Sequence, residues 1–313
     1  MKGIRLGLLA ALCVVGMLLT TGCQRRGDDR ILIGFVQSEA ADTWLSYLHD
    51  AFADYFRDRP EYHILWADSQ NDVIRQQDNV NALIAQGVQA LVIVPVDTSA
   101  AGPLTRAAQE AGIPLVYVNR NPYVGRTPPR GVYYVGSDSI ISGRMQMEEL
   151  GRQMGGEGQI AILMGQLNHE AAQDRTRGVR EVVAEQFPNI EIVTYQTGNW
   201  TRSEGVTVME NWLTAHPNLR AVASNNDEMA MGALVAIDSV GRSGILVGGT
   251  DGNPDALHAV RDGRLAVTVF QDAVGQGHGA ADYARRAIRG EQLESIRWVP
   301  FVRITEENVA DFL

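Results

Sequence analysis

The chain has 313 residues, of which 45% are hydrophobic and 20% charged, and its formal net charge at pH 7 is −10. This length and apolar content exclude a disordered chain and favour two globular domains. The acidic balance lacks the basic surface with which a protein neutralises nucleic-acid phosphates, so we expect no nucleic-acid partner.

The first 22 residues differ in composition from the rest of the chain. Lys2 and Arg5 precede an uncharged apolar stretch over 6–19, and small residues then lead to Cys23. A positive start, a short apolar run and a small-residue exit are typical of a secretory signal peptide, so we assign residues 1–22 to one. The apolar run is short for crossing a bilayer, which leaves a single transmembrane anchor as the less favoured alternative.

The exit sequence LTTGC resembles the lipobox of bacterial lipoproteins, in which the signal is removed before a cysteine that carries lipid. Thr20 stands where that class usually has leucine. Removal of residues 1–22 would also remove Cys13, so Cys23 would have no cysteine with which to form an intramolecular disulfide. We therefore expect Cys23 to be lipidated, residues 23–30 to be a tether without apolar side chains, and the protein to be exported to the cell envelope or periplasm, anchored to the membrane.

From Ile31 onward, short apolar runs alternate with longer segments of helical period. We expect strands at 31–37, 63–67, 90–94, 115–119, 133–136, 159–164, 190–197, 221–224, 245–250, 265–270 and 297–301, and helices that include 72–86 and 273–289. Nearly continuous apolar runs are typical of parallel strands buried on both faces. Prolines at 122, 128 and 129 interrupt the alternation. The pattern predicts an α/β fold with two doubly wound, Rossmann-like parallel-sheet lobes.

Motifs that would indicate catalysis are missing. The chain has neither the G-x-x-x-x-G-K-[ST] phosphate loop nor the G-x-S-x-G nucleophile elbow. His169 and Glu170 begin like the H-E-x-x-H zinc motif, but Gln173 stands where the second zinc ligand belongs. We therefore expect no enzyme activity and no cofactor.

Polar and aromatic residues follow the predicted strands, at the end where open α/β sheets bind ligands. They are Asp42, Trp44, Asn119, His169, Arg175, Trp200, Asn226, Asp251 and Gln271. Carboxylates, amides and guanidinium groups can each bind two neighbouring hydroxyls, and aromatic faces cover the C–H patches of a ring, so this mixture predicts a sugar or polyol.

Each of these residues also has a purely structural alternative. Trp44 and Trp200 could pack in the core, and Asn226 and Asp251 could cap helices. Asn119 and His169 could belong to turns or solvent-facing loops.

Five segments of the chain carry a family resemblance. They are DSQND at 68–72, GVQALVI at 87–93, YYVGSDSIISG at 133–143, NNDEMAMGA at 225–233 and GTDGNPDAL at 249–257. With them the chain resembles the type I periplasmic binding proteins, especially the galactose/glucose-binding and ribose-binding types, over nearly all of residues 31–313. The resemblance implies a ligand cleft between lobes made of 31–137 plus 272–298 and of 138–271 plus 299–313, joined by a hinge of three crossings.

The resemblance also implies roles for individual residues. The galactose/glucose pattern gives ligand contacts to the nine strand-end residues except Gln271, with Trp44 and Trp200 on opposite sides of a sugar ring. Arg120 and Gln271 match the ribose-binding type instead. Ala171 stands where the galactose/glucose type has an aspartate. Glycines at 155, 156 and 158 occupy the place of that type's calcium loop without its oxygen ligands, so we expect no structural metal.

The function implied is that of a substrate-binding lipoprotein of an ABC-type importer. Its ligand would be a monosaccharide, either a hexose such as galactose or glucose or a pentose, or a cyclic polyol, and its partners the permease and ATPase subunits. One alternative is a receptor that passes the bound state to a chemoreceptor or membrane kinase without transport. A sugar-responsive repressor is less favoured, because it needs a helix-turn-helix segment where this chain has its export signal.

Overall fold

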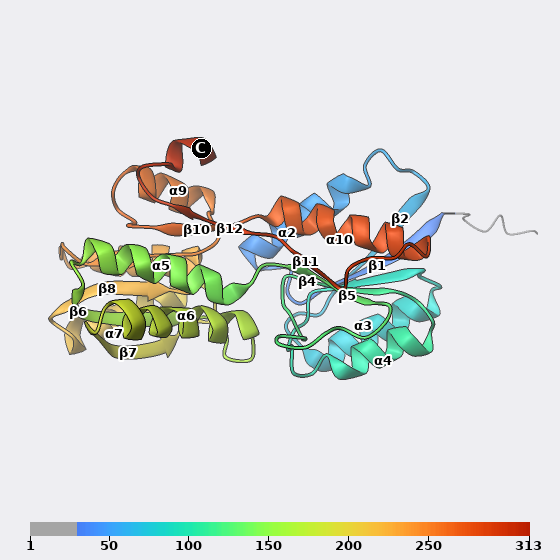
Figure 1. The fold of residues 1–313 in the computed structure, drawn as a ribbon, viewed down its shortest axis with the longest axis horizontal. Coiled ribbons are helices and arrows are strands. Elements are labelled where there is room, and N and C mark those ends of the chain that lie inside the picture. Colours follow the sequence, from blue (N-terminus) through green and yellow to red (C-terminus); the bar gives the residue numbers. More distant parts are fainter. Residues whose placement is uncertain (1–29) are drawn as a thin grey trace, which may run out of the picture.

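The computed structural model describes residues 30–313, and it consists of two α/β lobes side by side (Figure 1). The signal peptide, Cys23 and most of the tether lie outside the described residues. Each lobe is built on a parallel sheet, as predicted. Among the helices of the described residues, none combines the length and the apolar character that crossing a membrane requires.

The first lobe contains a six-stranded parallel sheet in the order β11-β5-β4-β3-β1-β2. Its strands are β1 (Ile31–Gln37), β2 (Tyr62–Asp68), β3 (Ala90–Ile93), β4 (Leu115–Val118), β5 (Val132–Gly136) and β11 (Ile296–Trp298). Every residue of β3 and β4 is buried. Burial on both faces accounts for the continuous apolar runs in these segments.

Two pairs of helices cover the faces of this sheet. Helices α2 (Thr43–Tyr55) and α10 (Ala273–Ile288) lie on one side, and α3 (Val73–Ala85) and α4 (Gly102–Glu110) on the other (Figure 1). Aspartates at the strand-to-helix turns set two of the helix starts, since Asp42 accepts the backbone N–H of Leu45 and Asp72 that of Arg75.

The second lobe combines a four-stranded parallel sheet, β7-β6-β8-β9, with an antiparallel pair, β10-β12. Its strands are β6 (Glu157–Met164), β7 (Asn189–Thr197), β8 (Leu219–Ser224), β9 (Leu246–Gly248), β10 (Thr268–Gln271) and β12 (Phe301–Ile304). Its helices are α5 (Ser139–Gln153), α6 (Glu170–Gln186), α7 (Arg202–Ala215), α8 (Asp227–Ser239) and α9 (Pro254–Arg261), followed by a 3₁₀ turn, η1 (Val309–Phe312).

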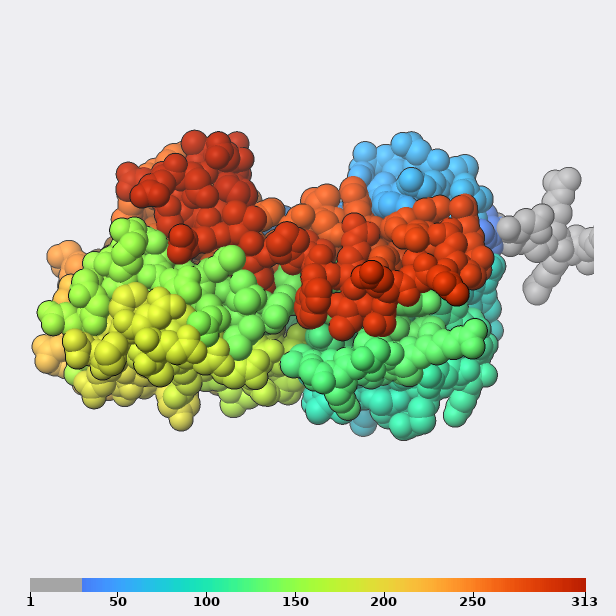
Figure 2. Space-filling view, viewed as in Figure 1, coloured from blue at the N-terminus to red at the C-terminus, as the bar shows by residue number. Residues whose placement is uncertain are grey.

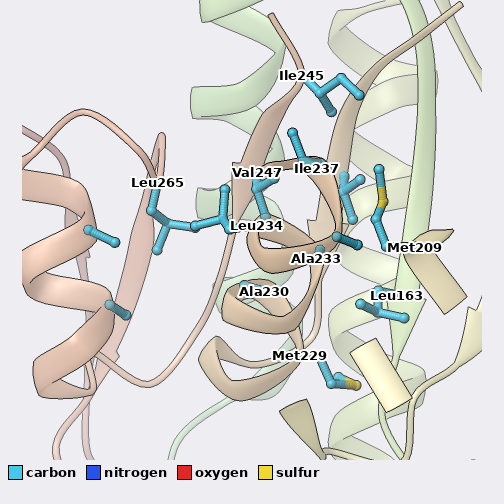
Figure 3. Packing of buried hydrophobic residues seen from close by; sticks show 14 of the residues in the cluster. Leu163, Met209, Met229, Ala230, Ala233, Leu234, Ile237, Ile245, Val247 and Leu265 are labelled. Atoms are coloured by element: carbon cyan, nitrogen blue, oxygen red, sulfur yellow. The ribbon is translucent and has the colours of Figure 1, made fainter. Parts of the chain in front are cut away.

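The core of the second lobe has one apolar cluster on each side of its sheet. Leu163 of β6 packs with Met209 of α7 and Met229 of α8 on one side (Figure 3). Ile162, the neighbour of Leu163 on the same strand, packs with residues of α5 and α6 on the other side. This alternation explains why β6 is apolar at successive positions.

The chain passes between the lobes three times, after β5, after β10 and between β11 and β12. The lobes form two masses that meet along one boundary (Figure 2). The single strand expected at 297–301 is wrong: β11 pairs in parallel with β5 of the first lobe, whereas β12 pairs antiparallel with β10 of the second. Pro300 separates them, and because proline has no N–H to donate to a ladder, the strand cannot continue through it.

Candidate functional site

A cavity of about 440 Å³, including its opening to solvent, lies between the lobes. Its wall consists of Asp42, Trp44, Leu45, Asn119, Arg120, Ser139, Ala171, Arg175, Trp200, Asn226, Asp251 and Gln271. Nine of the ten residues predicted from the sequence are therefore brought together on one surface, and the tenth, His169, lies outside the wall. Both sheets contribute, because the residues come from turns at the carboxyl ends of strands in each lobe.

The first lobe supplies an indole, a guanidinium, an amide and a carboxylate. Trp44 lies in the first turn of α2, and its indole N–H donates to the carbonyl of Gln271 at 3.2 Å. Arg120 follows β4 and donates from Nη1 to the carbonyl of Pro95 at 2.8 Å. Asn119 has φ = 67°, a backbone conformation that asparagine tolerates better than most residues. Asp42 combines two roles, since it caps α2 and lines the cavity.

The second lobe supplies a buried charged pair. Arg175 of α6 donates from Nη1 to the carbonyl of Asn225 at 2.5 Å and from Nη2 to Oε1 of Gln271 at 2.6 Å. Its Nη1 lies 3.7 Å from Oδ1 of Asp251. The Nε of Arg175 is buried without a hydrogen-bond partner, so one donor of the guanidinium is unsatisfied in this arrangement.

Burial raises the pKa of Asp251 well above its usual range, although the positive charge of Arg175 opposes that shift. Burial also lowers the pKa of Arg175. Both side chains are only 6% exposed. Asp251 and Arg175 are thus buried without a full set of hydrogen bonds, which favours a ligand that supplies both donors and acceptors.

The backbone at Asp251 adopts φ = 136°, a region that normally requires glycine. Asp251 forms an isolated bridge with Phe270, which holds this conformation next to the antiparallel pair. The residue does not cap α9, since that helix begins after Asn253. The alternative role as a helix cap is therefore wrong for Asp251.

Asn226, in contrast, does cap a helix. Its Oδ1 accepts the backbone N–H of Met229 at the start of α8, and its Nδ2 donates to the carbonyl of Trp200 at 3.1 Å. It also lines the cavity. The capping bond fixes the amide next to Trp200, so the structural role and a ligand-binding role are compatible.

His169 lies beside Trp200 and holds its indole in place. The indole N–H of Trp200 donates to Nδ1 of His169 at 2.8 Å, and the planes of the two rings differ by only 16°. Burial, with a smaller contribution from the charge of Arg120, lowers the pKa of His169 to about 2. The imidazole is therefore neutral and able to accept this bond.

Four further residues of the site were not predicted as contacts from the sequence. Leu45, Ser139 and Ala171 line the cavity, and a Cβ on Gly165 would lie 2.0 Å from the indole of Trp200. The small residues at 139, 165 and 171 leave space for the indole of Trp200 and for the cavity. Of these four residues, only Ala171 could be noticed in the sequence, because it stands where the galactose/glucose type has an aspartate.

Residues 30–313 contain no group of three or more histidine, cysteine, aspartate or glutamate side chains arranged to hold a metal ion.

Comparison with known proteins assigns this architecture to a family. The family described as "Periplasmic binding protein domain" matches residues 33–292. The chain belongs to the periplasmic binding protein family. Its members bind solutes, so this periplasmic binding protein is not an enzyme, in agreement with the missing catalytic motifs.

The similarity to individual proteins extends over most of the chain. A protein of Rhizobium meliloti named as a rhizopine-binding protein is 40% identical over 90% of this chain and 92% of its own length. The ribose import binding protein of Escherichia coli is 33% identical over 76% of this chain and 78% of its own. The structure of an ABC transporter solute-binding protein from Bacillus halodurans with bound myo-inositol superposes with a TM-score of 0.85 and 38% identity, covering 91% of this chain and 98% of that one.

Proposed function

We propose that this periplasmic binding protein captures a cyclic polyol or a monosaccharide in the interlobe cavity and delivers it to the permease and ATPase subunits of an ABC-type importer. The observation that carries the proposal is the composition of the cavity wall. Two indoles from opposite lobes lie among carboxylates, amides and guanidinium groups, and both lobes contribute polar contacts.

The charges on the wall favour a neutral ligand rich in hydroxyls. Asp42 and Asp251 are balanced by Arg120 and Arg175. A hydroxyl can donate to a carboxylate and accept from a guanidinium at the same time, so a polyol can satisfy both kinds of group. The indole faces of Trp44 and Trp200 would cover the C–H surface of the ring.

We place a cyclic polyol first among the candidate ligands. The protein from Bacillus halodurans holds myo-inositol, and the relative from Rhizobium meliloti is named for rhizopine. The alanine at 171, where the galactose/glucose-binding pattern has an aspartate, makes galactose and glucose weaker candidates. Ribose remains a candidate because Arg120 and Gln271 match the ribose-binding pattern.

Binding would be coupled to lobe closure. A ligand that contacts both lobes stabilises the arrangement in which they are together, and the importer would recognise that arrangement. We further propose that export by residues 1–22 and lipidation of Cys23 keep the protein at the membrane that carries the permease.

Thermal unfolding tests the proposed ligand class. A ligand that binds only the folded protein raises the unfolding midpoint. We expect myo-inositol to raise it at millimolar concentration, with smaller shifts for ribose, xylose and arabinose. The Asp251→Ala variant should unfold cooperatively and show no shift. Unchanged midpoints with all cyclic polyols and monosaccharides would contradict the proposal.

A further inference from the structure

Outside the ligand cavity, one five-residue segment of the second lobe bonds to three separate turns of the first. In the segment 166–170, Oε1 of Gln166 accepts from Nδ2 of Asn71 at 3.2 Å. Asn168 donates from Nδ2 to the carbonyl of Val96 at 3.3 Å. Oε1 of Glu170 accepts the backbone N–H of Asn121 at 2.8 Å. We call residues Gln166, Asn168 and Glu170 the interlobe latch.

The latch residues are every second residue of the segment 166–170. Their partners lie in the turns that follow three strands of the first lobe, β2, β3 and β4. None of the six bonded residues belongs to the cavity wall. Because each bond joins the two lobes, all three bonds are lost when the lobes separate. The latch can therefore stabilise the closed arrangement without touching a ligand.

The three bonds differ in their exposure to water. The bond between Asn71 and Gln166 is exposed, whereas Oε2 of Glu170 is buried and has no hydrogen-bond partner. Exposed bonds contribute little, because water replaces them when they break. The bond from the N–H of Asn121 to Oε1 of Glu170 is partly buried and its acceptor is a carboxyl, so it contributes more. Glu170 is therefore the member of the latch on which closure depends most.

The surroundings of Glu170 disfavour a negative charge. Burial raises its pKa to about 7, against the opposing effects of the Asn121 N–H and the charge of Arg120. Asp174, one turn further along α6, adds to the rise. Glu170 also interacts electrostatically with Arg175 of the same helix and with Tyr134 of β5. Two more charged groups, Arg126 and Asp138, line the interlobe hollow that Glu170 faces.

We propose that the latch stabilises the closed lobes and that closure takes up a proton at Glu170, so that ligand affinity depends on a residue outside the cavity. The inference rests on the proposed function only for the choice of ligand. Glu170 is a positioning residue, since it acts through the fraction of the protein that is closed, and apparent affinity scales with that fraction.

The direction of the pH effect follows from proton linkage. When the lobes are apart, the carboxyl of Glu170 is free to contact water and its pKa returns towards the ordinary value of about 4.3. The protonated carboxyl of Glu170 therefore stabilises the closed lobes fully below about pH 4.3, the pKa with the lobes apart. This stabilisation is lost as the pH rises to about 7, the pKa with the lobes closed. Ligand affinity should therefore fall between pH 5.5 and pH 8 through this group. Glu170→Gln keeps an acceptor for Asn121 but cannot ionise, so it should lack this part of the fall.

The test compares the wild type with Glu170→Gln and Glu170→Ala by calorimetric titration with myo-inositol at pH 5.5 and pH 8. We expect Glu170→Ala to bind about tenfold more weakly than the wild type at pH 5.5, a difference of about 1.4 kcal/mol. Glu170→Gln should bind more tightly than the wild type at both pH values, and by a larger factor at pH 8. Equal affinities of Glu170→Ala and the wild type, or identical pH profiles of Glu170→Gln and the wild type, would overturn the proposal.

Small-angle X-ray scattering of the ligand-free proteins separates the latch from the choice of ligand. Glu170→Ala should have a larger radius of gyration than the wild type at pH 5.5, and Glu170→Gln should not. Equal radii of all three proteins would contradict the latch. A larger radius of Glu170→Ala together with no heat from myo-inositol would support the latch and refute the proposed ligand. Unfolding midpoints of the three proteins check that the substitutions leave the fold intact.

Discussion

The indole N–H of Trp200 is hydrogen-bonded to Nδ1 of His169 at 2.8 Å, and the two rings lie nearly in one plane. This pair joins the end of β7 to the start of α6 and fixes the plane of an indole that faces the cavity. His169 itself is only 1% exposed. The imidazole therefore supports a candidate ligand contact instead of forming one.

The first prediction concerns this support. His169→Phe keeps an aromatic ring beside Trp200 but removes the acceptor for its N–H, so we expect ligand affinity to fall by about five- to tenfold. Calorimetric titration measures the change. Trp200→Phe removes the matching donor, and the effects of the two substitutions should be less than additive in a double-mutant cycle. Fully additive effects would show that the bond does not act through Trp200.

A second prediction concerns acid stability. The pKa of His169 is about 2 in the folded protein and about 6.5 in an unfolded chain. A lowered pKa stabilises the folded state above pH 6.5, and this contribution is lost as the pH falls below that value. Between pH 7 and pH 5 the wild type should lose about 2 kcal/mol more of its unfolding free energy than His169→Phe. Urea unfolding at the two pH values measures this, and equal losses would contradict the prediction.

A third prediction uses a glycine as a steric probe. A Cβ on Gly165 would lie 2.0 Å from the ring of Trp200, so Gly165→Ala must displace the indole. We expect at least a tenfold loss of ligand affinity. Gly102→Ala at the start of α4 is the control, since the nearest atom to its added Cβ is 3.5 Å away and affinity should not change. Wild-type affinity of Gly165→Ala would show that the position of Trp200 is not critical.

A fourth prediction separates binding from backbone strain at Asp251. Asp251→Ala and Asp251→Gly both remove the carboxylate, and both should abolish detectable binding. Because φ = 136° is costly for alanine and not for glycine, the glycine variant should be more stable to unfolding by about 1 kcal/mol. Denaturant unfolding of the two variants tests the difference. Retained binding by either variant would remove Asp251 from the proposed contacts.

A fifth prediction concerns the proposed anchor. Cys23→Ser removes the thiol that lipid would be attached to, so we expect the variant protein to appear in the soluble fraction after cell fractionation. The wild type should sediment with membranes. Continued membrane association of the variant would refute lipidation at Cys23.

Much of the fold could be predicted from the sequence because buried parallel strands are recognisable by themselves. The run 31–37 coincides with β1, and the runs 159–164 and 190–197 lie within β6 and β7. The error at 297–301 has a different origin. Its two halves pair with sheets of different lobes, and such long-range pairing leaves no local pattern apart from Pro300.

Site residues could be predicted where their position at the end of a strand determines their location. They could not be predicted where the packing of one element against another determines the contact. Residues such as Asn119 and Asp251 follow strands, so their convergence is a property of parallel sheets. The bond from His169 to Trp200 and the clearance at Gly165 depend on how the turn after β6 meets the turn after β7. The latch from Glu170 to Asn121 depends in addition on how the two lobes meet. No spacing within one segment encodes these contacts.

Calorimetric titration of the purified protein with myo-inositol measures directly whether the interlobe cavity binds a cyclic polyol. We expect saturable binding of one molecule per chain, which is lost in Arg175→Ala because that substitution removes the guanidinium that contacts Gln271 and faces Asp251. The absence of heat with myo-inositol and with every monosaccharide tried, or unchanged binding by Arg175→Ala, would contradict it.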